Sequence, residues 1–75
     1  MEWEQSLRTE AFYTLRASHE ESRVPNLAII RKHKGERKWR LRMWSDAMGD
    51  FVELTKATDL EALKVIGILN AQREN

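Results

Sequence analysis

The sequence predicts an α+β fold, in which an N-terminal helix is followed by a three-stranded antiparallel β-meander and a C-terminal helix packed on one sheet face. Two observations carry this prediction. Polar and apolar residues alternate from Lys38 to Trp44, as in a half-buried strand. Thr58-Asp59-Leu60-Glu61 has the form of a capping box and precedes a broad apolar helical face. At 75 residues, the chain is expected to form a single domain, residues 1–75.

Residues 2–21 give mixed signals. The segment Phe12-Tyr13-Thr14 favours a strand. Apolar residues nevertheless recur at intervals of four, as on one face of a helix, at Trp3, Leu7, Ala11 and Leu15. We predict a helix, while residues 9–17 could be either helix or strand. The polar run that follows, together with Pro25, predicts a connecting loop over residues 18–26.

Three strands joined by two glycine-containing turns are predicted between Leu27 and Lys56. They are expected at Leu27 to His33, at Arg37 to Trp44 and at Phe51 to Lys56. Gly35 lies where a short hairpin loop needs a positive φ, and Gly49 lies in the second turn.

The alternation in the second strand assigns its side chains to two faces. Trp39, Leu41 and Met43 should be buried beneath the C-terminal helix, and Lys38, Arg40 and Arg42 should face water. In the third strand, Val52 and Leu54 alternate with Glu53 and Thr55. We expect Trp39 in the core and Trp3 capping the core from the first helix.

Charge is strongly segregated along the chain. The net charge is +1, but residues 31–42 carry seven basic residues and one acid, whereas residues 1–23 and 43–75 are both net acidic. The middle of the chain is therefore a local docking site for an anionic partner, or is partly neutralised by its own flanks.

Several classes of function are disfavoured. The chain has no cysteine, so we expect neither disulfides nor thiolate metal sites, and its apolar runs are too short to span a membrane. His19 precedes Glu20-Glu21, but these residues are adjacent in sequence and not at the spacing of a metal site, and His33 lies beside a basic hairpin tip. Asp46 and Asp50 lack the alternating ligands of a calcium loop. We therefore expect a cytoplasmic protein that is not an enzyme and holds no cofactor and no metal.

The basic hairpin is the feature with a functional interpretation. A row of cations on a two-stranded ribbon can follow a phosphate backbone, and Trp44 could stack on a base or a sugar. In the alternative interpretation, Glu53 pairs with Arg40 or Arg42 across the sheet and the patch is an ion-paired, solvated face. The candidate contact residues are Arg31, Lys32, Lys34, Arg37, Lys38, Arg40, Arg42 and Trp44.

The predicted order of helix, three strands and helix resembles the double-stranded-RNA-binding domain, and its second half is similar to the arm-binding domains of phage and transposon integrases. The likeness rests on that order, on Tyr13 to Leu15 before a loop with Pro25, and on the basic hairpin at Lys32-His33-Lys34-Gly35. It implies that this hairpin dips into a groove. The RNA-binding family opens its second helix with lysines, whereas Thr58-Asp59-Leu60-Glu61 would repel phosphates, so DNA is favoured over double-stranded RNA.

The sequence thus predicts a small binding module that contacts nucleic-acid phosphates through its basic hairpin. The alternative is a protein-interaction module, such as a small phage or mobile-element inhibitor that docks on a host protein, because separate acidic and basic patches orient docking. A homodimer formed through an exposed strand edge is a third expectation.

Overall fold

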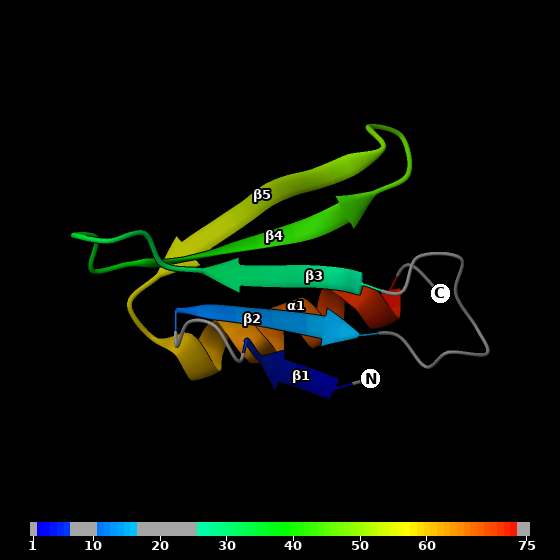
Figure 1. Cartoon of the computed structure of the whole chain (residues 1–75). Helices are drawn as coiled ribbons and strands as arrows, with labels where there is room; N and C mark the ends of the chain where they lie inside the picture. Colours follow the sequence, from blue (N-terminus) through cyan, green and yellow to red (C-terminus); the bar gives the residue numbers. More distant parts are fainter. Residues whose placement is uncertain (1, 7–10, 17–25, 74–75) are drawn as a thin grey trace.

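The computed structural model describes residues 2–6, 11–16 and 26–73. In these residues, a five-stranded antiparallel sheet carries one helix on one of its faces (Figure 1). The elements are β1 (Glu2–Gln5), β2 (Phe12–Arg16), β3 (Asn26–Arg31), β4 (Trp39–Ser45), β5 (Asp50–Ala57) and α1 (Leu60–Arg73). Each strand pairs with its neighbour in the chain, in the order β1-β2-β3-β4-β5.

The predicted N-terminal helix is wrong, because the described residues of this region form two paired strands. Trp3 lies opposite Leu15 in the β1–β2 register, and Tyr13 lies opposite Ile30 in the β2–β3 register. The aromatic and β-branched run at Phe12 favours a strand, and its backbone completes the hydrogen bonding of β3. The order expected from the resemblance is therefore not the order of this chain. Leu7 and residues 18–25 of the loop predicted over 18–26 lie outside the described residues, whereas Asn26, the last residue of that prediction, begins β3.

The three-stranded meander is present as β3, β4 and β5, with somewhat different bounds from those predicted. Lys32 and His33 follow the end of β3, and Lys38 precedes β4 instead of belonging to its alternating face. The two turn glycines adopt the expected left-handed conformation, with φ of 88° at Gly35 and 65° at Gly49.

A β-bulge in β5 changes which side chains share a face. Leu41 is opposite Thr55, but the next residue of β4, Arg42, is opposite Glu53, so Leu54 is an extra residue in β5. The regular alternation predicted for Val52 to Thr55 is therefore interrupted. On the far side of the bulge, Lys56 lies opposite Arg40.

The core lies between the sheet and α1. Its fully buried large side chains are Leu15, Ile30, Leu41 and Leu63. Leu41 is therefore buried as predicted, whereas Trp39 and Met43 pack against the core but are only half-buried. α1 contacts β3, β4 and β5, and it is not long and apolar enough to cross a membrane. The residue that caps its first turn is Asp59 and not Thr58, since Oδ1 of Asp59 accepts from the backbone N–H of Glu61 at 3.1 Å and of Ala62 at 3.3 Å.

Trp3 joins the two ends of the described fold. Its Nε1 donates to the backbone carbonyl of Lys64 at 3.0 Å, and its indole ring lies against Gly67 of the helix. Trp3 therefore packs on the core as expected, but from a strand and not from a helix.

Candidate functional site

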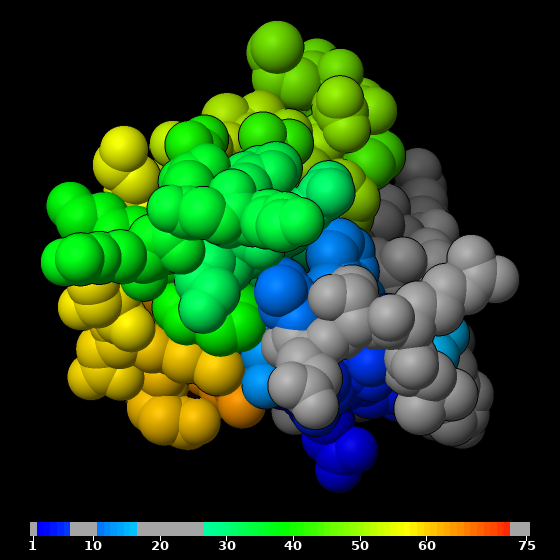
Figure 2. Space-filling view, turned by 60° about the vertical axis from the view of Figure 1, so that its left-hand side comes forward, coloured from blue at the N-terminus to red at the C-terminus, as the bar shows by residue number. Residues whose placement is uncertain are grey.

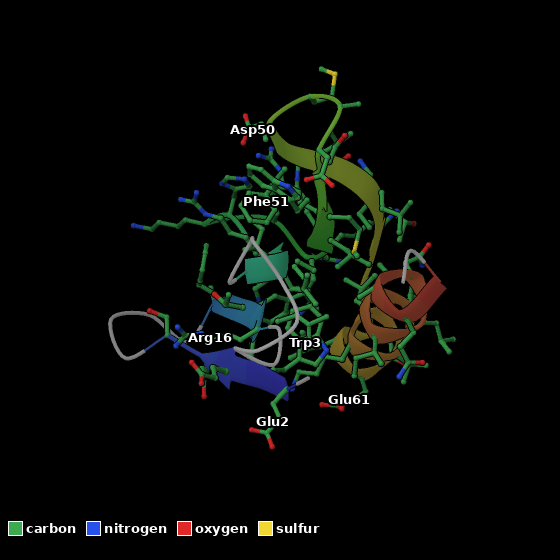
Figure 3. The ribbon with its side chains drawn as sticks, turned by 90° about the vertical axis from the view of Figure 1, so that its right-hand side faces the viewer. Glu2, Trp3, Arg16, Asp50, Phe51 and Glu61 are labelled. Atoms are coloured by element: carbon green, nitrogen blue, oxygen red, sulfur yellow. The ribbon has the colours of Figure 1, made fainter. Side chains whose placement is uncertain are left out.

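The candidate site lies on the sheet face opposite α1. Because side chains alternate along each strand, those that lie between the core positions point away from the helix. Figure 3 shows Trp3 on the helix side of the sheet and Phe51 on the other side. We call this second side the open face. In the part of the chain that the structure describes, no helix covers it (Figure 1).

Two rows of side chains cross the open face at right angles to the strands. In the first row, Phe12, Arg31, Arg40 and Lys56 are successive cross-strand neighbours from β2 to β5. In the second row, the neighbours are Glu4, Thr14, Ile29, Arg42 and Glu53. Trp44 and Phe51 form a further pair beyond the second row. The pairing of the strands thus gathers four cations and three aromatic rings that are spread over 45 positions of the sequence, from Phe12 to Lys56.

Arg40 is held by carboxylates of the same molecule. Its Nη2 donates to Oε2 of Glu36 at 3.1 Å, and its Nη1 donates to Oε1 of Glu53 at 3.4 Å. The hydrogen bonds and the charge of Glu36, followed by the charge of Glu53, raise the pKa of Arg40 above its usual value. The ion-paired interpretation is therefore correct for Arg40, whose side chain is only 30% exposed.

The other three cations of the two rows have no carboxylate partner among the residues that the structure describes. Arg31, Arg42 and Lys56 are all exposed. Arg42 lies opposite Glu53 in the register, but the ion pair of Glu53 goes to Arg40. The open face therefore keeps a cationic centre after its internal ion pairs are formed.

The β3–β4 loop extends this cationic surface. It contains Lys32, Lys34, Arg37 and Lys38, of which the last three are exposed. Lys32 is held with its Nζ 4.9 Å from the centroid of the Trp39 ring. The loop stands beside the start of β2 (Figure 2), and a hollow between the two is lined by Phe12, Arg31 to Glu36, Ser6 and Ala11. His33 lies in this hollow, and its backbone carbonyl closes the turn by accepting from the N–H of Glu36 at 3.0 Å.

Trp44 is half-buried and held in one orientation. Its Nε1 donates to Oδ1 of Asp46 at 2.8 Å, and its ring meets the ring of Phe51 edge to face with centroids 5.3 Å apart. A planar ligand that stacks on this pair would cost little side-chain entropy, because the ring is already fixed.

The tip of the β4–β5 hairpin carries the opposite charge. Asp46 and Asp50 are exposed there, on the far side of Trp44 from the cations. The potential of the open face therefore changes along β4, from positive near the β3–β4 loop to negative near the hairpin tip. An anionic ligand would be attracted to the first region and repelled from the second.

The sequence-predicted contact residues do not all lie on one face. The structure brings Arg31, Arg40, Arg42 and Trp44 together on the open face, and places Lys32, Lys34, Arg37 and Lys38 in the adjoining loop. Sequence reasoning missed Phe12, Phe51 and Lys56. The strand signal at Phe12 could have revealed the first of these, but the position of Lys56 depends on the bulge.

The described residues contain no group of three or more side chains suited to hold a metal ion. No protein-family model matches the chain, and the comparisons with curated proteins and with solved structures give no match.

Proposed function

We propose that this protein is a non-enzymatic module that binds nucleic acid through the open face and the β3–β4 loop. The observation that carries the proposal is the cross-strand placement of Arg31, Arg42 and Lys56, which are exposed and free of described carboxylate partners. A phosphate backbone bound along them would release condensed counterions, which supplies affinity without regard to sequence.

Phosphate contacts are assigned to two groups of residues. Arg31, Arg42 and Lys56 would bind phosphates on the sheet, and Lys34, Arg37 and Lys38 would bind them at the loop. Lys32 and Arg40 support the surface instead, because Trp39 and two glutamates already hold them. These contacts position a polyanion and do not by themselves read its bases.

A binding titration over a salt series tests the proposal. Labelled DNA and RNA are titrated with the protein at several salt concentrations, and we expect log K to fall linearly with log salt concentration. Arg42→Glu should weaken binding and lower the salt slope, because it removes one phosphate contact and adds a repulsive charge. Affinity that is independent of salt, or no affinity for any nucleic acid, would contradict the proposal.

A control variant matches the change in net charge. Arg42→Glu changes the net charge from +1 to −1, and the double variant Val65→Glu with Gln72→Glu reaches the same net charge on the outer side of α1. If overall charge alone governed binding, both variants would lose it equally. We expect the control to keep most of the affinity of the unmodified protein, since its charges lie on the face away from the cations.

Docking on a host protein is a second candidate function, and a different surface favours it. Val65 and Leu69 are apolar, yet 57% and 54% exposed, and they lie on the outer side of α1. A protein partner would remove them from water. A protein that co-purifies with the chain, is lost on Val65→Asp and is kept on Arg42→Glu would favour this function over nucleic-acid binding.

A further inference from the structure

Aromatic rings on the open face stand where a bound polyanion would lie. Phe12 is the cross-strand neighbour of Arg31, and Trp44 is two residues along β4 from Arg42. Neither ring is fully buried. An interface that served phosphates alone would have no need of these rings.

Neither α1 nor the tip of the β4–β5 ribbon suits the major groove of a duplex. The major groove, about 12 Å wide, accepts a protruding helix or a two-stranded ribbon. α1 lies on the opposite side of the sheet, and its exposed positions Glu61, Val65, Leu69 and Gln72 carry no cation. The β4–β5 ribbon extends beyond the sheet (Figure 1), but its tip carries Asp46 and Asp50.

We infer that the open face selects single-stranded nucleic acid, whose unpaired bases stack on Trp44 and Phe12 while the cations between these rings bind the phosphates. The inference rests on the proposed function and narrows it to one class of ligand. A single strand exposes the flat faces of its bases, whereas a duplex keeps them stacked on one another. The fixed orientation of Trp44, held by Asp46 and Phe51, favours stacking further.

The dimensions of the sheet fit this arrangement. Trp44 lies four residues along β4 from Arg40, and two strand spacings separate β2 from β4. At ~3.3 Å per residue and ~4.8 Å per strand, the backbones at Phe12 and Trp44 are about 16 Å apart. A nucleic-acid strand that crosses the face diagonally therefore spans several nucleotides and passes over Ile29, with Arg31 and Arg42 on either side of its path.

The test compares one sequence in two forms. An oligothymidylate of about 12 nucleotides, a length within the range that single-strand-binding folds cover, is titrated alone and as a duplex with its complement. We expect the single strand to bind at least about tenfold more tightly, because only it can gain stacking energy. Equal or tighter binding of the duplex would overturn the inference and leave the proposed function standing. Binding of neither form would overturn both.

Tryptophan fluorescence locates the bases. Trp3 and Trp39 pack against the core, so quenching by the oligothymidylate should come from Trp44. Trp44→Phe should abolish the quenching and keep affinity within a few-fold. Trp44→Ala should reduce affinity by about fivefold or more, as expected for the loss of one stacked base. If quenching persists in Trp44→Phe, the bases do not lie on the open face and the inference fails.

A second comparison separates lost stacking from lost folding. Leu69→Ala, on the outer side of α1, serves as a truncation control away from the open face. Far-ultraviolet circular dichroism and the urea midpoint are measured for every variant. Should Trp44→Ala unfold, Phe12→Leu provides the same measurement at the other ring, and unchanged single-strand affinity in that variant would count against the inference.

Discussion

The contact between Trp3 and Gly67 shows how a single residue can decide whether two elements fit. A Cβ atom on Gly67 would lie 2.7 Å from Cζ2 of Trp3, closer than unstrained contacts allow. The indole cannot easily retreat, because its Nε1 is hydrogen-bonded to the carbonyl of Lys64. Glycine lowers the intrinsic stability of a helix by ~1 kcal/mol relative to alanine, and here it makes room for the ring.

We predict that Gly67→Ala destabilises the protein by about 1 kcal/mol. The gain in helix propensity is ~1 kcal/mol, and overpacking of this kind costs about 1–3 kcal/mol. Urea unfolding monitored by circular dichroism measures the difference. Repeating the substitution in a Trp3→Phe background should remove the penalty, because the smaller ring leaves space. A Gly67→Ala protein more stable than the unmodified one would show that the indole moves aside freely.

At the scale of elements, α1 is capped by Asp59 and not by Thr58, the cap that the sequence motif predicts. The motif Thr58-Asp59-Leu60-Glu61 indicated a helix correctly, but the backbone N–H groups of the first turn are bonded by Asp59. Asp59 also places a negative charge at the positive end of the helix dipole.

Asp59→Ala should therefore cost about 1 kcal/mol, the usual value for the loss of an N-cap side chain. Thr58→Ala should change stability by less than about 0.5 kcal/mol, as is typical of exposed sites without special contacts. Thermal or urea denaturation of the two variants side by side decides the matter. The reverse ranking would restore Thr58 as the cap.

The meander and the last helix could be predicted from the sequence because their signals are local. The alternation in β4, the turn glycines and the capping motif each lie within a few residues. β1 and β2 could not be predicted in this way, because apolar residues recur every four positions from Trp3 to Leu15, which is the spacing of a helix face. Those two residues are cross-strand neighbours in the structure. β2 forms a strand because it pairs with β3, a contact between separate segments that no short stretch of sequence reveals.

For the molecule as a whole, the proposed binding of an anionic ligand depends less on the net charge than on which cations are already paired with carboxylates of the same chain. The excess of cations in residues 31–42 was evident from sequence. The sequence left open whether Glu53 pairs with Arg40 or Arg42, and it did not reveal that Glu36 also binds Arg40 or that the bulge places Lys56 opposite Arg40. The partner of Glu53 and the position of Lys56 depend on the cross-strand register. The sequence therefore predicts that the candidate site is cationic, but it identifies only some of the residues that form it.

Removing one of the neutralising acids should strengthen the proposed nucleic-acid binding. Glu53→Gln deletes a negative charge from the open face and leaves Arg40 with Glu36 as its carboxylate partner. We expect single-stranded DNA to bind about two- to fivefold more tightly at low salt, a change of the size that exposed charge pairs support. Fluorescence anisotropy at two salt concentrations measures it.

The matched control for that variant is Glu61→Gln. It makes the same chemical change at the start of α1, where Glu61 pairs with Lys64 away from the open face. Its affinity should stay near that of the unmodified protein, because screening weakens a charge placed on the far side. Equal tightening by both variants would show that net charge, and not the placement of Glu53, sets the affinity.

The hydrogen bond from Trp3 to the carbonyl of Lys64 joins positions 61 residues apart, while every strand pairs with its immediate neighbour in the chain. The hairpins can therefore form one after another, each with a small entropic cost of loop closure. The indole of Trp3, in contrast, can reach its hydrogen-bond partner only after α1 has packed on the sheet. During refolding, the burial of the Trp3 indole against α1 should accordingly be the last step and the most cooperative one.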